Sequence, residues 1–147
     1  MATMQPDGPA LEELSSAECL RLLATVPIGR ISYTRQALPA VEPVNFAVHD
    51  GAIVIRTDGG GKLAAAIRRA VVAFQADDLD PVLRSGWSVT VVGRCEEVTD
   101  AADIAGLDKL SLESWAPSSR DHYIRIVPGI VTGRRLRRRR AQSTTGT

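Results

Sequence analysis

The residues with the greatest chemical potential in this chain surround a run of three glycines. Arg56 and Thr57 end an apolar run, Gly59 to Gly61 follow, and Lys62 opens an alanine-rich stretch. A guanidinium can place two N–H donors on one anion, and glycines let backbone amides approach a ligand closely. A lysine at a helix start opposes the helix dipole unless an anion lies nearby. The pattern therefore favours an anion site, and a solvated, charged turn is the alternative interpretation.

The common phosphate-binding motifs do not fit this segment. Gly61-Lys62 is followed by Leu63 rather than Ser or Thr, and Arg56 stands where a P-loop needs its first glycine. The glycine run also lacks the GxGxxG spacing of dinucleotide folds. An anion site here would have to be of another kind.

Other chemistry finds little support in the sequence. Two histidines and two scattered cysteines give no metal-ligand spacing, the acidic run at 77–80 lacks the spacing of a calcium loop, and no GxSxG motif occurs. We expect His49 to be exposed beside a turn, whereas His122, near Trp115 and Arg120, could line a substrate mouth. We therefore predict no metal and assign no catalytic side chain.

The elements that must position the anion site begin with a helix over 15–26, in which Ser15 and Glu18 have capping-box spacing. Strands are expected at 28–34, 39–49 and 52–57, with Asp50-Gly51 as a tight hairpin turn. Pro43 removes one backbone donor from its strand, so it must lie at an edge, a bulge or a split in the sheet.

The second half of the chain predicts a helix over 61–70, strands over 71–77 and 87–100, and a helix capped by Asp100 that ends near residue 111. Two last strands are expected at 123–127 and 129–136. Six or seven strands and about three helices, with no βαβ rhythm, predict a mainly β fold. An antiparallel barrel or sandwich with helices at its periphery fits best.

Composition predicts one domain over 15–136, a mobile N-terminus over 1–14 and a disordered basic tail over 137–147. No run is long enough to span a bilayer and no signal segment opens the chain, so we predict a cytoplasmic protein. Six arginines between 134 and 140 leave a charge near −5 on the rest of the chain (+1 minus 6). The body therefore carries no nucleic-acid footprint, and we interpret the tail as solvated.

An ordered series of motifs then suggests a family. PVNF, a DG hairpin, RT, GK opening a helix, GWSV and GR on a long strand, and a final TGRR follow one another between Leu14 and Leu136. This series resembles the pyridoxamine 5'-phosphate oxidase-like family of FMN-binding split β-barrels, and within it the small bacterial flavin-binding branch. The resemblance implies a flavin-dependent oxidoreductase that passes hydride or electrons through FMN to a small molecule.

The resemblance also implies site residues. The flavin phosphate would be held by Arg56, Thr57 and Lys62, and the isoalloxazine would lie along Pro43, Val44, Asn45 and Phe46, held by main-chain groups. Homodimers with the cofactor at the subunit interface are implied too, with Trp87 and Ser88 contributed by the partner chain.

The sequence departs from true pyridoxamine phosphate oxidases at its end. It reads TGRRL followed by a basic tail, instead of an arginine-leucine-proline type ending that binds substrate phosphate. We therefore do not expect pyridoxamine phosphate oxidation. Two alternatives remain open: a deazaflavin-dependent reductase on the same fold, and a non-catalytic flavin or ligand sensor whose arginine-rich tail contacts nucleic acid.

Overall fold

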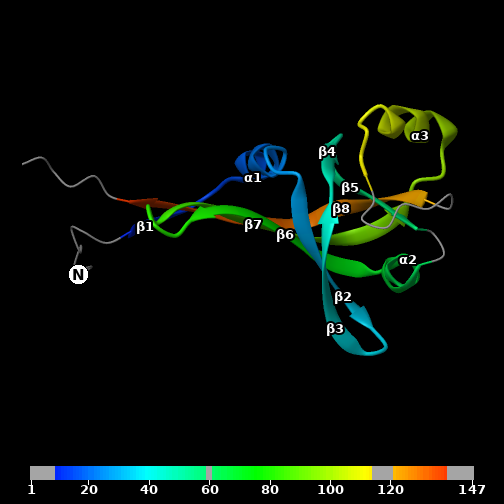
Figure 1. Cartoon of the computed structure of the whole chain (residues 1–147), viewed down its shortest axis with the longest axis horizontal. Coiled ribbons are helices and arrows are strands. Elements are labelled where there is room, and N and C mark those ends of the chain that lie inside the picture. The colour runs from blue at the N-terminus through cyan, green and yellow to red at the C-terminus, as the bar shows by residue number, and fades with distance from the viewer. Residues whose placement is uncertain (1–8, 59–60, 114–120, 139–147) are drawn as a thin grey trace, which may run out of the picture.

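In the described part of the chain, one antiparallel sheet curls into a split β-barrel with three helices outside it (Figure 1). The structure is a computed structural model that describes residues 9–58, 61–113 and 121–138. The strands are β1 (Pro9–Glu13), β2 (Ile28–Arg35), β3 (Leu38–Asn45), β4 (Ala47–His49), β5 (Ala52–Asp58), β6 (Val71–Asp80), β7 (Ser85–Glu97) and β8 (Asp121–Arg138). The helices are α1 (Ser16–Leu23), α2 (Lys62–Ile67) and α3 (Ala101–Asp108). The predicted mainly β, antiparallel barrel is thus confirmed.

The barrel is split because two consecutive strands lie at opposite ends of the sheet. The strand order is β3-β2-β6-β7-β8-β5-β4, and β1 pairs with β8 beside this path. The chain crosses from β3 to β4 at Phe46, so the predicted single strand over 39–49 is two strands. Pro43 lies in β3, the terminal strand of the path, where a missing N–H is tolerated.

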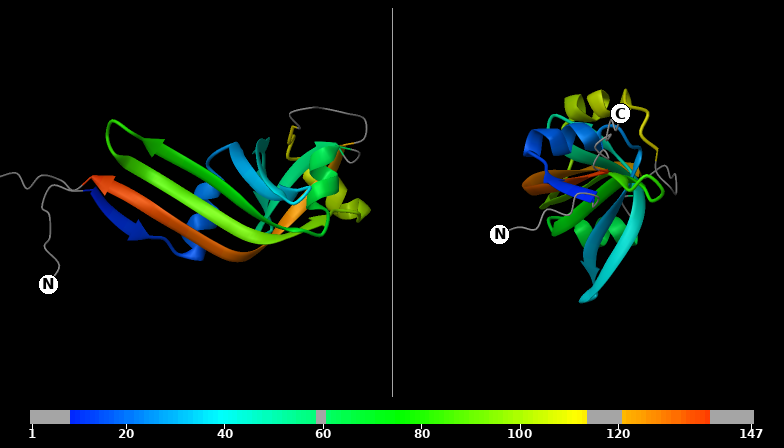
Figure 2. Two further views of the ribbon diagram at one scale, coloured as in Figure 1. Left: turned by 90° about the horizontal axis from the view of Figure 1, so that it is seen from below. Right: turned by 90° about the vertical axis from the view of Figure 1, so that its left-hand side faces the viewer.

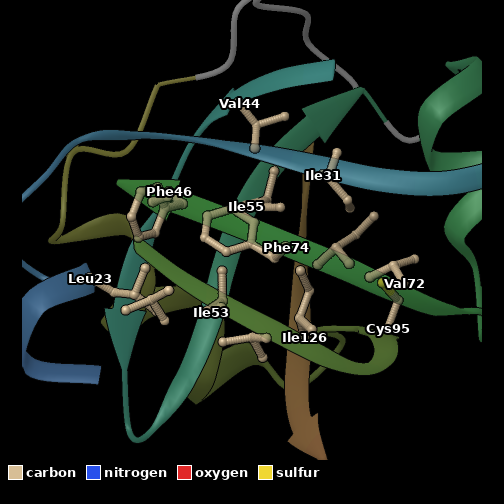
Figure 3. Close-up of a cluster of buried hydrophobic side chains, with 14 of the residues drawn as sticks. Leu23, Ile31, Val44, Phe46, Ile53, Ile55, Val72, Phe74, Cys95 and Ile126 are labelled. Carbon is tan, nitrogen blue, oxygen red and sulfur yellow. The ribbon is translucent and has the colours of Figure 1, made fainter. Parts of the chain in front are cut away.

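The interior of the barrel is filled by alternate residues of these strands (Figure 3). The Phe46 and Phe74 rings meet edge to face, with their centroids 4.7 Å apart. Ile31, Ile53 and Ile55 are almost completely buried around them. A second cluster, Val54, Val98, Leu107, Leu112 and Tyr123, lies under α3 on the opposite face of β5 and β8. The helices α2 and α3 therefore cover opposite faces of β5.

A long arm extends away from the barrel and is built from the outer halves of β6, β7 and β8 together with β1 (Figure 2). The expectation of a mobile segment over 1–14 is not met at residues 9–13, which pair with β8 from Pro9↔Arg138 to Glu13↔Arg134. Arg137, expected in a disordered tail, lies in β8 and forms an ion pair with Glu12 at 3.5 Å. Residues 139–147 lie outside the described part of the chain.

One continuous strand, β8, replaces the two strands expected around Pro128. Its ladder with β7 runs through Gly93↔Pro128 and then Val92↔Ile130, so Gly129 is the extra residue of a β-bulge. A Cβ at Gly93 would come within 2.0 Å of the Val127 carbonyl oxygen, so glycine is required for this close approach. The bulge accommodates the proline without breaking the strand.

The local signals at helix and hairpin ends are confirmed. The Ser15 hydroxyl accepts a hydrogen bond from the Glu18 amide (3.2 Å), and the Asp100 carboxylate accepts one from the Asp103 amide (3.1 Å). Asp50 and Gly51 both have positive φ, as the tight turn requires. Within the described residues, no helix is long and apolar enough to cross a bilayer.

Candidate functional site

The corner where β5 ends and α2 begins carries two of the three predicted phosphate ligands. Thr57 is the one buried polar side chain among the described residues, with 8% of its surface exposed. Strand alternation places it on the same face as Ile53 and Ile55, toward the interior and α2. Lys62 is the first residue of α2, which packs against β2 and β5. The buried Thr57 and the first residue of α2 therefore lie at the same corner.

Arg56 occupies the opposite face of β5. Its guanidinium carbon lies 5.7 Å from the centre of the Tyr123 ring, and its Nη1 donates a hydrogen bond to the Leu112 carbonyl (3.3 Å). The Tyr123 hydroxyl donates in turn to the Asp108 carboxylate at 2.7 Å. The contacts of Arg56 therefore stabilise the segment that follows α3. Its role as a phosphate ligand stays a prediction.

An ionisable pair that the sequence did not indicate, His122 and Glu97, lies beside Thr57. His122 is the ladder partner of Thr57 on β8, and its Nδ1 lies 2.9 Å from the Glu97 carboxylate. Both side chains line a small cleft next to α2, together with Arg68 and Cys95. Burial raises the pKa of the Cys95 thiol to about 12, so this sulfur is a neutral packing group. Only the three-dimensional ladder brings Glu97 to His122, 25 residues away in sequence.

The segment predicted to face the flavin ring offers main chain rather than side chains. Val44 and Phe46 are buried in the barrel interior, whereas Pro43 is exposed and Asn45 half-buried. The Phe46 amide donates to the Pro27 carbonyl at 3.2 Å, which fixes the crossing between β3 and β4. Since β3 is a terminal strand, one edge of its backbone is available to a ligand.

Trp87 and Ser88 lie on the arm, in the part of β7 that extends away from α2 (Figure 1). Trp87 is buried in the main core, with 7% exposed. Ser88 points to the other face, where Gln75 Nε2 lies 3.3 Å from its hydroxyl and 2.7 Å from Asp77 Oδ2. One chain thus assembles the β3, β5 and α2 parts of the predicted site at the barrel and leaves the β7 part on the arm.

The arm also carries a pocket of about 560 Å³. It lies where β1 ends beside β8. Its lining consists of Glu13, Leu14, Ser88, Thr90, Val131, Thr132, Gly133 and Arg134. Three hydroxyls, one cation and one carboxylate make it a polar pocket, and we call it the arm pocket below. Of these lining residues, Ser88 alone was predicted from the sequence as a site residue.

Comparison with known proteins places this geometry in a family. The model of the pyridoxamine 5'-phosphate oxidase family matches residues 15–135. An uncharacterised protein of Mycobacterium tuberculosis, Rv0080, is 45% identical over 129 residues, which are 84% of each chain. The FAD binding protein of Mycobacterium smegmatis superposes with a TM-score of 0.76 and 38% identity, covering 86% of this chain and 98% of that one.

A further solved structure extends the likeness. An FAD-binding protein of Mesorhizobium loti superposes with a TM-score of 0.70 and 26% identity, covering 85% of this chain and 97% of that one. The matched range includes every predicted site residue, from Pro43 to Ser88. The chain therefore belongs to the pyridoxamine 5'-phosphate oxidase family.

Proposed function

We propose that this protein is a flavin-dependent oxidoreductase that holds the riboflavin phosphate at the corner between β5 and α2. The observation that carries the proposal is the buried Thr57 hydroxyl, at the place where the family resemblance expects the phosphate. Two relatives with solved structures are named for binding FAD, which contains the same riboflavin phosphate. When bound, the flavin supplies the hydride and electron chemistry, and the protein supplies position and electrostatics.

The residues of the barrel fit such a cofactor. Thr57 would donate its hydroxyl to the phosphate, and Lys62 would neutralise part of the phosphate charge. The exposed backbone edge of β3, at Pro43 to Asn45, would bind the polar edge of the isoalloxazine. We propose FMN as the minimal cofactor, because the corner needs only one phosphate.

We further propose a homodimer in which Ser88 of the partner subunit completes the site. The face of the sheet opposite the core carries a mostly apolar row across five strands: Val41, Ser32, Ala73, Val92 and Ile130 are successive ladder partners. Val41 and Ile130, at its two ends, are 63% and 61% exposed. The three residues between them are half-buried, so the row is a partly exposed, mostly apolar strip, which fits a protein interface. Ser88 lies on the same face, four residues before Val92 on β7.

The experiment that tests the cofactor is a spectrum of the purified protein after gel filtration, with the mass of any ligand released on denaturation. Oxidised-flavin bands that travel with the protein, and a released mass of FMN or FAD, support the proposal. Release of a deazaflavin would move the chain to the deazaflavin alternative. A protein that neither retains nor takes up flavin would refute the proposal. A stopped-flow screen with NADH and NADPH then identifies the electron donor.

A further inference from the structure

We infer that Gln75 and Asp77 are positioning residues that hold the Ser88 hydroxyl as a hydrogen-bond donor to the flavin of the partner subunit. The inference rests on the proposed function, in which Ser88 completes the site of the other chain, and it names the residues that orient this hydroxyl. All three side chains are half-buried and lie on the face of the sheet opposite the core.

The orientation of the Gln75 amide follows from its neighbour on the same strand. Gln75 Nε2 lies 2.7 Å from Asp77 Oδ2. An ionised carboxylate accepts hydrogen bonds and cannot donate them, so the amide group that faces Asp77 must be the NH₂ rather than the carbonyl oxygen. The chemistry of the pair therefore fixes the rotation of the amide, which the shape of a glutamine side chain leaves open.

The second hydrogen of the same NH₂ group determines what Ser88 can do. Gln75 Nε2 lies 3.3 Å from the Ser88 hydroxyl oxygen, so the amide donates to that oxygen. A hydroxyl has one proton, and when its oxygen accepts from Gln75 that proton points elsewhere. The Ser88 hydroxyl donates to no side chain in the described ranges, and Arg134, its ladder partner on β8, carries donors only. Ser88 thus keeps one donor for a ligand.

The charges around Asp77 suit a surface that a second chain covers. Arg30 is the ladder partner of Gln75, and its Nη1 lies 3.9 Å from Asp77 Oδ2. The cation and the amide therefore both face the same carboxylate oxygen. Burial of a charge in an interface is costly unless the charge is paired and hydrogen-bonded. Asp77 has both kinds of partner already, so a partner subunit could cover it without rearranging the network.

The network also continues the proposed interface along the arm. On β6, Ala73 belongs to the mostly apolar row, and Gln75 and Asp77 are the next two residues on the same face. Asp77 is in turn the ladder partner of Ser88 on β7. The oriented hydroxyl therefore lies beside the surface where we propose that the partner subunit binds, and a flavin offers carbonyl, ring-nitrogen and phosphate acceptors for its proton.

The test is a double-mutant cycle on flavin affinity, measured by fluorescence titration of the apoprotein with FMN and, separately, with FAD. Ser88→Ala should weaken binding about fivefold, as expected for loss of one hydrogen bond. Asp77→Asn keeps the side-chain size, but its amide can donate to Gln75, which lets the glutamine turn its oxygen toward Ser88 and take the hydroxyl proton. It should weaken binding by a similar factor. The double variant should bind no more weakly than Ser88→Ala alone, because Asp77 acts through Ser88.

Asp78→Asn is the matched control, because Asp78 follows Asp77 on β6 and points to the opposite face. It should bind flavin as wild type does, and circular dichroism and light scattering should show that every variant keeps the wild-type fold and mass. The inference would be overturned by losses that add in the double variant, by Ser88→Ala or Asp77→Asn binding flavin like wild type, or by loss of the dimer in Asp77→Asn. Failure of the wild type itself to bind either flavin would refute the proposed function as well, so the two failures are read from different proteins.

Discussion

At the scale of single residues, the predicted phosphate site divides between two faces of β5. Thr57 faces α2, whereas Arg56 contacts Tyr123 and Leu112 on the side of α3. The two residues are adjacent in sequence, but strand alternation points their side chains to opposite faces of β5. Substitutions can therefore separate ligand binding from structural support.

Replacing Thr57 by Val, or Lys62 by Ala, is expected to remove bound flavin while the fold remains. The loss of one hydrogen bond to a charged phosphate costs about 1.5–3 kcal/mol, a fall in affinity of roughly ten- to a hundredfold. The ratio of flavin to protein absorbance measures the effect, with circular dichroism as the control for folding. Undiminished flavin content in the Thr57→Val, Lys62→Ala double variant would show that the phosphate lies elsewhere.

Replacing Arg56 by Ala is expected mainly to lower the free energy of unfolding. It removes the cation–π contact with Tyr123 and the hydrogen bond to Leu112, which together contribute about 1–2 kcal/mol. Urea unfolding of the apoprotein measures this change. Arg56→Ala that unfolds like wild type and yet loses flavin would instead make Arg56 a direct ligand.

The buried Cys95 thiol makes the free energy of unfolding depend on pH in the alkaline range. Burial raises its pKa from 9.0 to about 12 in the folded chain. Between these values the unfolded chain loses the thiol proton while the folded chain keeps it, so stability falls as pH rises from 9 to 12. Cys95→Ala should flatten this part of the stability curve measured by urea titration. An unchanged slope would show that other groups dominate the alkaline limit.

At the scale of elements, the packing of α1 on β8 depends on the absence of one side chain. A Cβ at Gly133 would lie 2.5 Å from the Cys19 sulfur and 3.0 Å from Val89 Cγ2. Cys19 is fully buried in α1, so the helix must move if residue 133 carries a methyl group.

Gly133→Ala is therefore expected to destabilise the protein by about 1–3 kcal/mol. Adding Cys19→Ala should recover part of the loss, because the shortest contact is removed. Gly106→Ala in α3 is the matched control: a Cβ there meets nothing within 4 Å, and alanine in a helix should raise stability by about 0.5–1 kcal/mol. Thermal unfolding of the four proteins measures these differences. Equal effects at positions 133 and 106 would contradict the packing argument.

The elements also show what the sequence could and could not predict. Local signals held: Ser15 and Asp100 cap their helices, and Asp50-Gly51 forms its turn. The strand β1 was missed because PALEE has no alternation of apolar and polar residues, and its pairing with β8 joins residues more than 120 positions apart.

Side-chain sites that depend on several strands were equally hidden. Alternation in VVAFQAD could have indicated that Gln75 and Asp77 face away from the core. Nothing local in the sequence could place Glu97 beside His122 or Glu13 beside Arg134, because those contacts depend on ladder register. Of the candidate site, the sequence therefore indicated the residues on both sides of the glycine run and missed most of the arm pocket.

At the scale of the whole molecule, the apolar row on the outer sheet face predicts the oligomeric state. We expect a dimer, and Ile130→Asp should convert it to a monomer because a charge buried in an apolar contact must be desolvated. Light scattering after gel filtration measures the mass. Leu38→Asp is the control: Leu38, at the end of β3 beside the β2–β3 turn, is 68% exposed and lies outside the row.

The Ile130→Asp variant also tests whether flavin binding requires the dimer. If the partner subunit completes the flavin site, Ile130→Asp should lose flavin together with the dimer, and Leu38→Asp should keep both. A wild-type monomer that binds flavin fully would contradict the shared site.

The pairing of β1 with β8 has a mechanical consequence. Pro9 and Arg138 stand opposite each other at the start of that ladder, so a pulling force applied at these two points loads its rungs one after another. Single-molecule stretching would then peel the N-terminal ribbon away at low force and leave the barrel intact. A handle fused to either residue would emerge from the same tip.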